Sequence, residues 1–243
     1  MNLPIAKENI LFLDIETVPE FENFDDLSPT LQELFATKTS YQRNPNGADE
    51  IPAKDFYEKA GIWAEFGKII CISVGYFVKS KTKRSFRTKS FFGVDETQIL
   101  SGFKSLLEGH FSDTKYVLCG HNAKEFDFPF IARRLIVHQI PLPEKLNLFG
   151  KKPWEIPHLD TMELWKFGDF KHYTSLQLLS ETLKIPSPKD DIDGSQVATI
   201  FYKEKDIQRI ADYCEKDTVA VAQLYLRYNN EPLLTTEELV HAI

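Results

Sequence analysis

Two acidic side chains near the N-terminus are the first residues that could carry chemistry. Asp14 and Glu16 follow the apolar run Ile10–Leu13 in the stretch Asp-Ile-Glu-Thr. Side chains alternate along a strand, so both carboxylates should face the same side of a sheet. Ionised carboxylates held close together repel unless a cation lies between them, and a hard divalent ion prefers oxygen ligands. The pair indicates half of a magnesium or manganese site, although a solvated strand end with two acids would look the same.

Asp127 is a second candidate, because it lies between two phenylalanines. It follows a short apolar stretch at residues 116–119 and stands at the start of a helical pattern. The neighbouring Phe126 and Phe128 imply that the carboxylate is partly buried. An acid stabilised by the dipole at a helix N-terminus is the alternative interpretation.

A third candidate group lies near the C-terminal end of the chain. Tyr213 and Asp217 are four residues apart in a long helical pattern, so they share a helix face with Ile210 and Leu224. Asp217 therefore interrupts an apolar stripe, and burying an acid without a partner is costly. Metal ligation, a firm hydrogen-bonding partner or a place at the rim of the core would each resolve this conflict.

The apolar pattern predicts the elements that must position these side chains. Short or alternating apolar runs predict strands at 10–13, 68–78, 84–92, 116–119 and 156–159, with the second and third forming a hairpin. Helical spacing marks residues 96–107, 126–137 and almost all of the chain from 161 to 228, where Pro186 and Pro188 should break the helix and residues 190–194 should form an acidic turn. The expected fold class is α/β, a mixed sheet of about five strands flanked by helices.

The whole chain, residues 1–243, is expected to form a single domain. Residues 22–61 are polar and irregular, with one short helix predicted at Leu31–Phe35 and a loop at 41–49. This stretch has too little apolar material for a core of its own. We therefore predict an insertion at about 22–61 and no second domain.

The composition is that of a globular protein without a bulk positive charge. Of the 243 residues, 42% are hydrophobic and 13% aromatic, which is enough for a sizeable core. The net charge of −7 argues against sequence-independent binding driven by overall charge, but not against an enzyme that meets only a chain end. No apolar run is long enough to cross a bilayer and no signal peptide is recognisable, so we expect a soluble cytoplasmic protein.

The three cysteines indicate a reducing environment. Cys71, Cys119 and Cys214 are odd in number and form no Cys-x-x-Cys pair. We expect buried, reduced thiols. A zinc site is not expected, because the usual spacing of its ligands is absent.

The three acidic segments together resemble the DEDD superfamily of exonucleases. One branch of that superfamily has a histidine five residues before the last aspartate, whereas the other, the DEDDy branch, has a tyrosine four residues before it. Position 212 is aspartate and position 213 is tyrosine, so the resemblance is to the tyrosine branch. It is strongest to stand-alone predicted 3′→5′ exonucleases related to the exonuclease domain of family B DNA polymerases, and extends from about residue 10 to residue 228.

This resemblance implies a ribonuclease H-like sheet and a two-metal hydrolysis of nucleic acid from its 3′ end. The products would be nucleoside 5′-monophosphates and the favoured substrate single-stranded DNA. Two divalent ions, Mg²⁺ or Mn²⁺, are the implied cofactors. The implied catalytic residues are Asp14, Glu16, Asp127, Tyr213 and Asp217, of which the four acids would bind metal and Tyr213 would position the attacking water.

Secondary assignments follow from the same resemblance. Thr17, Asn122 and Phe128 would contact the last nucleotides, although the ring of Phe128 could equally belong to the core. Asp160 could support the site or cap the helix that follows it. No polymerase domain follows in this chain, so any proofreading is expected to act in trans.

Two rival functions remain open at this stage. A 3′→5′ exoribonuclease would use the same acids, and no recognisable residue senses a 2′-hydroxyl. A non-catalytic nucleic-acid binding module could share the fold, because fold alone does not determine function.

Overall fold

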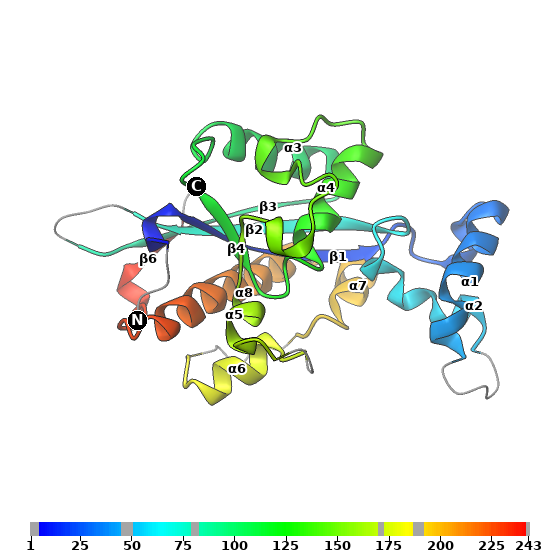
Figure 1. Ribbon diagram of the computed structural model, residues 1–243. Coiled ribbons are helices and arrows are strands. Elements are labelled where there is room, and N and C mark those ends of the chain that lie inside the picture. The colour runs from blue at the N-terminus through cyan, green and yellow to red at the C-terminus, as the bar shows by residue number, and fades with distance from the viewer. Residues whose placement is uncertain (1–4, 45–50, 79–82, 170–172, 187–191, 242–243) are drawn as a thin grey trace.

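A mixed sheet of six strands forms the centre of the protein (Figure 1). The structure, a computed structural model, describes residues 5–44, 51–78, 83–169, 173–186 and 192–241. The strand order is β5-β4-β1-β2-β3-β6. The strands are β1 (Ile10–Pro19), β2 (Gly67–Phe77), β3 (Phe86–Phe92), β4 (Val117–Gly120), β5 (Leu159–Asp160) and β6 (Leu239–His241).

The central strand β1 joins the two halves of the sheet. It pairs antiparallel with β2, and β2 pairs antiparallel with β3, which confirms the predicted hairpin. On its other side β1 pairs in parallel with β4, but only from Ile10 to Phe12. The second half of β1 therefore extends past the end of β4 and leaves room there for the chain that follows β4.

The sheet has one strand more than we predicted. The additional strand β6 pairs in parallel with β3, at the edge of the sheet. Its three residues are too few to show a period of two, so the sequence pattern could not reveal it. Arg84 fixes the approach to β6, since its guanidinium bonds both carboxylate oxygens of Glu238 (2.8 and 2.7 Å) and the carbonyl oxygen of Leu233 (2.7 Å).

Helices cover both faces of the sheet. In Figure 1, α3 and α4 lie on one face, and α8 lies on the other with α5 and α6 beyond it. The helices are α1 (Pro29–Arg43), α2 (Ala53–Phe56), α3 (Glu96–Glu108), α4 (Asp127–Val137), α5 (Thr161–Lys166), α6 (Leu176–Thr182), α7 (Val197–Thr199) and α8 (Ile207–Tyr228).

The predicted helices at 96–107 and 126–137 are confirmed to within one residue at each end. From 161 to 228 the chain is less helical than we predicted, because helices end at more places than the expected break at Pro186 and Pro188 and the turn at 190–194. α5 ends at Phe167 with a left-handed backbone (φ 45°), and the π-helical turn Ile200–Glu204 ends in the same way at Lys205 (φ 60°). The apolar periodicity does not mark these helix ends. Neither Phe167 nor Lys205 is a glycine, the residue type that usually indicates a left-handed helix end.

Alternation along β1 sorts its side chains between the two faces. Leu11, Leu13 and Ile15 belong to the hydrophobic cluster that contains the apolar residues of α3 and α4. Ile10 and Phe12 belong instead to the cluster that contains Val221 and Tyr225 of α8 and its neighbours. Continuing the alternation places Asp14 and Glu16 on the α8 face of the sheet.

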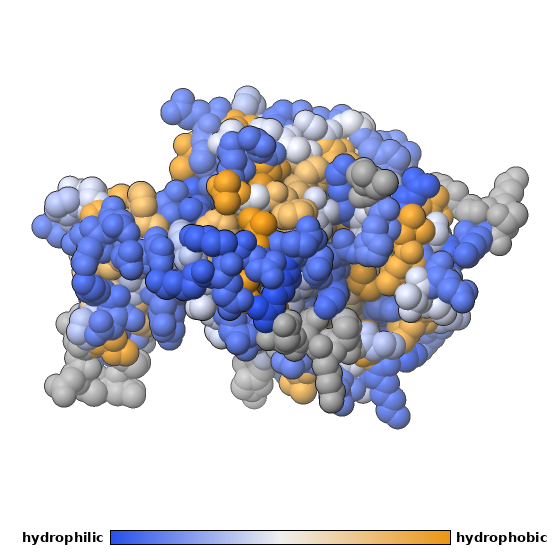
Figure 2. Space-filling view, turned by 180° about the vertical axis from the view of Figure 1, so that it is seen from behind, coloured by the Kyte–Doolittle hydropathy of each residue, from blue (hydrophilic) through white to orange (hydrophobic). Residues whose placement is uncertain are grey.

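Residues 22–44 and 51–61 form a lobe beside the sheet. Helix α1 is 15 residues long, where we predicted only the five residues 31–35. Its N-cap is Ser28, whose hydroxyl accepts a bond from the amide of Leu31. Phe35 of this helix belongs to a separate small hydrophobic cluster, which the lobe forms together with Phe66: Leu27, Phe35, Phe56, Tyr57, Ala60 and Phe66. Apolar material is thus more plentiful here than the sequence suggested. In Figure 2 this lobe projects to the side of a mainly hydrophilic face.

None of the helices in the described part of the chain is both long and apolar enough to span a membrane.

Candidate active site

Asp14 and Glu16 lie on the part of β1 that extends past β4. Asp14 pairs with Ser73 of β2 and Glu16 with Cys71, and the register then shifts between Glu16 and Thr17. Asp14 is partly buried, and Glu16 has 9% of its surface exposed. The two carboxylates therefore stand together under α8, as the alternation of side chains predicted.

Asp127 reaches the same place from the other side of β1. It is the first residue of α4 and is buried, with 4% of its surface exposed. Its carboxylate accepts a hydrogen bond from the backbone of Ile15, the residue between Asp14 and Glu16. Burial is the main cause that raises the pKa of Asp127 to about 8. The phenylalanine flanks therefore signalled burial correctly.

Helix α8 supplies the remaining two predicted residues. Its N-cap is Asp206, whose side chain accepts a bond of 3.2 Å from the amide of Arg209. Ile210 is fully buried in a cluster with Val18 and Ile70 of the sheet, whereas Leu224 is fully buried in a cluster with Leu179 of α6. Tyr213 and Asp217 are partly buried beside this stripe, and the tyrosine hydroxyl donates a hydrogen bond to the Asp217 carboxylate.

Electrostatics links the four acids into one group. Burial raises the pKa of Asp14 and of Glu16 well above its usual value. After burial, the charge of Asp217 is the largest influence on both groups, and the charge of Asp127 acts in the same direction. Like charges raise one another's pKa only at short range, so the structure brings the four predicted acids together. An added cation would relieve this repulsion.

Tyr213 stays neutral in this environment. Burial raises its pKa, and the neighbouring charges of Asp217, Glu16 and Asp14 raise it further. A phenol that is protonated at every working pH is no base, but it can orient a water molecule.

Cys214 is a site residue that the sequence analysis missed. Its thiol donates to the backbone oxygen and to Oδ2 of Asp14, each at 3.4 Å. Ligand atoms of Asp14, Glu16 and Cys214 lie within 4.8 Å of one another. All three cysteines are free and buried, as predicted. The contact with Asp14 depends on how α8 packs on β1, and no local spacing encodes that.

Asp160 organises the loop that leads to Asp127. One of its oxygens accepts bonds from the amides of Asn122 (3.0 Å) and Met162 (2.9 Å), and the other accepts from Lys124 (3.0 Å). It is thus the predicted cap of α5 and also a support for the site. Asn122 has a left-handed backbone (φ 60°), and its buried Oδ1 accepts no hydrogen bond from the described residues.

The other two predicted substrate contacts differ from each other. The hydroxyl of Thr17 donates to the carbonyl oxygen of Gly61 (2.8 Å), so it can only accept a bond from a ligand. The expectation that Phe128 contacts nucleotides is wrong. Its ring is fully buried and packs edge-on against His158 with centroids 5.1 Å apart, so it belongs to the core.

Tyr173 is a second residue that sequence reasoning missed. Two thirds of its surface (67%) is exposed. Burial of part of the ring raises its pKa, and the charges of Asp127, Asp14 and Asp217 raise it further, so its hydroxyl lies near the acids. His121 anchors the adjoining segment by a 2.8 Å bond to the carbonyl oxygen of Thr174.

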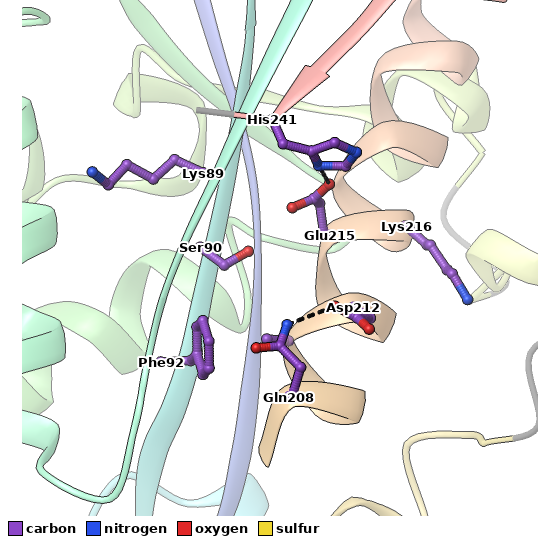
Figure 3. A pocket seen from close by; sticks show the side chains of 9 residues that line it. Lys89, Ser90, Phe92, Gln208, Asp212, Glu215, Lys216 and His241 are labelled. Atoms are coloured by element: carbon purple, nitrogen blue, oxygen red, sulfur yellow. Dashed lines mark hydrogen bonds and ion pairs between the residues drawn. The ribbon is translucent and has the colours of Figure 1, made fainter. Parts of the chain in front are cut away.

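A cavity of about 580 Å³ lies apart from these acids, between β3 and α8. Figure 3 shows its lining side chains, which come from β3, α8 and His241. Its polar groups largely pair with one another, since Glu215 bonds His241 (2.6 Å) and Gln208 bonds Asp212 (2.8 Å). None of the predicted site residues lines this cavity.

Comparisons with known proteins give one family and one fold. Residues 62–240 match a family model described as a predicted 3′-5′ exonuclease related to the exonuclease domain of PolB. The match leaves out β1, so Asp14 and Glu16 are joined to the site by the structure alone. No curated protein matches the sequence.

Among solved structures, the chain resembles a family B DNA polymerase from the hyperthermophilic archaeon Pyrobaculum calidifontis, with a TM-score of 0.52 and 17% sequence identity. The similarity covers 89% of this chain and 24% of the polymerase chain. At this identity the likeness establishes the fold, a ribonuclease H-like α/β sheet.

Proposed function

Because the chain belongs to the family of predicted 3′→5′ exonucleases related to the exonuclease domain of family B DNA polymerases, we propose that it shortens single-stranded DNA from the 3′ end. The reaction is hydrolysis of the terminal phosphodiester, and the product is a nucleoside 5′-monophosphate. The chain corresponds to about a quarter of the polymerase that it resembles, 24% of its length, so the activity of that whole protein is not carried over.

One observation carries the proposal: three distant segments bring their acids to one place. Asp14 and Glu16 come from β1, Asp127 from the start of α4, and Asp217 from α8. Two observations support this placement: the backbone of Ile15 donates a hydrogen bond to Asp127, and the charges of the other three acids raise the pKa of Asp14. A structural role gives no reason to bury several like charges without cations beside them.

The donor set fits hard divalent ions, Mg²⁺ or Mn²⁺. Carboxylate oxygens are the ligands that such ions prefer, and Asp14, Glu16, Asp127 and Asp217 would hold them. When bound, two such ions acidify a water molecule and stabilise the charge that develops on the phosphate and the leaving oxygen.

Tyr213 positions the attacking water in this proposal. Its O–H is engaged by Asp217, so the phenol oxygen keeps its lone pairs to accept a bond from water. The same bond fixes the ring between the helix and the acids. Orientation of this kind lowers the barrier without transferring a proton to the tyrosine.

The terminal nucleotide would be held by groups around β1 and the loop before α4. Asn122 offers an unused, buried carbonyl oxygen, which suits an N–H or O–H donor of the nucleotide. Thr17 can accept a hydrogen bond from a 3′-hydroxyl, since its own proton goes to Gly61. Tyr173 is exposed beside the acids and suits stacking on an unpaired base.

We also propose that the chain is a single exonuclease domain with an insertion at about residues 22–61. The family match begins at residue 62, which leaves this segment outside the shared part. Its separate hydrophobic cluster supports the same division.

Digestion of matched DNA and RNA oligonucleotides, labelled at the 5′ end, tests the proposal. We expect a ladder of shortened labelled DNA and unlabelled mononucleotides in Mg²⁺ or Mn²⁺. Faster digestion of RNA would identify an exoribonuclease. Binding without shortening of either oligonucleotide would identify a non-catalytic module and overturn the proposal.

A further inference from the structure

Cys214 places a sulfur atom among the acids of the candidate site. The thiol is fully buried and lies 3.4 Å from Oδ2 of Asp14. Ligand atoms of Asp14, Glu16 and Cys214 lie within 4.8 Å of one another, a spacing that one cation can bridge. Magnesium and manganese prefer oxygen ligands, so the proposed function does not explain why a sulfur atom lies beside these carboxylates.

The spacing of these atoms matches a tetrahedral zinc site. With zinc–sulfur bonds of about 2.3 Å and zinc–oxygen bonds of about 2.0 Å, a tetrahedral angle sets sulfur and oxygen about 3.5 Å apart. The observed separation of Cys214 Sγ from Asp14 Oδ2 is 3.4 Å. The two side chains therefore need little movement to hold one ion.

Glu16 is an independent sign that a cation belongs here. Its side chain is directed at this group and is nine-tenths buried, with 9% of its surface exposed. No described residue donates a hydrogen bond to its carboxylate. A buried carboxylate without donors is stabilised strongly by a metal ion.

We propose that Asp14, Glu16 and Cys214 form a mixed carboxylate–thiolate site for a thiophilic divalent cation, Zn²⁺ or, as a probe, Cd²⁺. This ion would compete with the hard ions for Asp14 and Glu16, and would inhibit the enzyme. The competitive effect rests on the proposed function, whereas the binding of the ion does not.

The chemistry of binding is an exchange of a proton for a metal ion. The S–H bond of Cys214 breaks, a metal–sulfur bond forms, and the proton passes to water. Thiolate and carboxylate ligands together favour zinc over manganese and magnesium, in keeping with ligand softness and the order of divalent affinities. The absence of a zinc-type spacing in the sequence does not exclude this site, because its ligands come from β1 and α8.

Cadmium absorption spectroscopy tests the site without any substrate. A cadmium–thiolate bond gives an ultraviolet charge-transfer band, so one equivalent of Cd²⁺ is added to chelator-stripped protein. We expect the band in the wild type and in the control Cys119→Ala, whose cysteine is buried in another cluster. We expect no band in Cys214→Ser. Asp14→Asn should weaken Cd²⁺ binding more than about tenfold, the least that loss of a ligand costs.

Cys71 requires its own control, because it hydrogen-bonds Cys214. In Cys71→Ala the band should keep its full intensity, whereas half the intensity would mean that two sulfur atoms bind the ion. A band that persists in Cys214→Ser or is indifferent to Asp14→Asn, or no band in the wild type, would overturn the proposal. Circular dichroism checks that Cys214→Ser is folded, and Cys214→Ala replaces it if it is not.

Zinc inhibition then separates this inference from the proposed function. In Mg²⁺, the Zn²⁺ concentration for half-inhibition should be more than about tenfold higher in Cys214→Ser than in Cys119→Ala. A wild type that gives the cadmium band but digests no nucleic acid would refute the proposed function and leave the site standing. Digestion without a cadmium band would refute the site alone.

Discussion

Asp127 illustrates how burial sets the chemistry of a single acid in this site. Its pKa rises from 3.8 to about 8, chiefly because the carboxyl is buried. Between about pH 4 and pH 8 this carboxyl is therefore protonated more in the folded protein than in the unfolded chain. Over that window, the contribution of Asp127 to the stability of the metal-free protein falls as the pH rises.

Asp127→Asn should remove part of this pH dependence. The amide imitates the neutral acid, so the chelator-treated variant should melt above the wild type at pH 8, by roughly 2–4 °C for each kcal/mol gained. At pH 5 the two should differ little in this respect. Thermal denaturation followed by circular dichroism provides the comparison. An equal loss of stability at both pH values would contradict the burial argument, and exposed Asp113→Asn serves as control.

Tyr213→Phe tests the positioning role of the phenol. Loss of the hydroxyl should lower kcat by about ten- to a hundredfold, the scale of a misplaced reacting group, and should leave KM nearly unchanged. Since the pKa of Tyr213 is raised, the pH–rate profile should keep its shape. A limb of that profile that disappears in Tyr213→Phe would instead identify the tyrosine as a base. Tyr41→Phe, at an exposed position, is the matched control.

Residue types and spacing marked the four acids and Tyr213 as candidates, because each motif is local in sequence, and the family resemblance joined them into one proposed site. Cys214 lies between two of these residues and was nevertheless missed. Its contact with Asp14 joins residues 200 positions apart and depends on the packing of α8. The prediction that Phe128 contacts nucleotides was wrong, because a residue next to a site acid in the sequence can still point into the core.

At the level of elements, Arg84 fixes the segment that leads into the C-terminal strand β6. Arg84 bonds Glu238 through two nitrogens and holds the pKa of that carboxyl down at about 2. Such an acid stabilises the fold above its ordinary pKa of 4.5, and this contribution is lost as the pH falls toward 2.

Arg84→Ala should lower the free energy of unfolding at pH 7 by about 1–3 kcal/mol, since several charge-assisted bonds are lost together. The difference from the wild type should shrink as the pH is lowered from 5 toward 3. Urea denaturation at several pH values measures both effects. Lys115→Ala removes an exposed pair with Asp113 and should lower the free energy of unfolding much less than Arg84→Ala does, because solvent screens an exposed ion pair. Equal costs in the two variants would contradict the role of Arg84.

Elements with a strong period were predicted well from the sequence. The hairpin β2–β3 and the helices α3 and α4 show clear apolar periods. β6 and the helix ends at Phe167 and Lys205 were not predicted, because pairing with a distant strand and left-handed backbone at residues other than glycine leave no local pattern. These errors do not affect the predicted site residues, because those residues lie on elements that have a clear apolar periodicity.

At the scale of the whole molecule, the candidate site depends on β1 as much as on the part of the chain that the family model covers. The family match covers residues 62–240 and therefore Asp127, Tyr213 and Asp217. Asp14 and Glu16 enter the site only because β1 lies beside β2 and under α8 in the folded chain. The central claim is that these two parts of the chain make one metal-dependent site.

The most direct test is digestion of 5′-labelled single-stranded DNA by the wild type, Asp14→Ala and Asp217→Ala, with exposed Asp113→Ala as control. The account predicts shortening from the 3′ end by the wild type and the control in Mg²⁺ or Mn²⁺, and none by the two site variants, although circular dichroism shows them folded. Excess EDTA should stop the reaction. Full activity in either site variant, or in EDTA, would contradict the account.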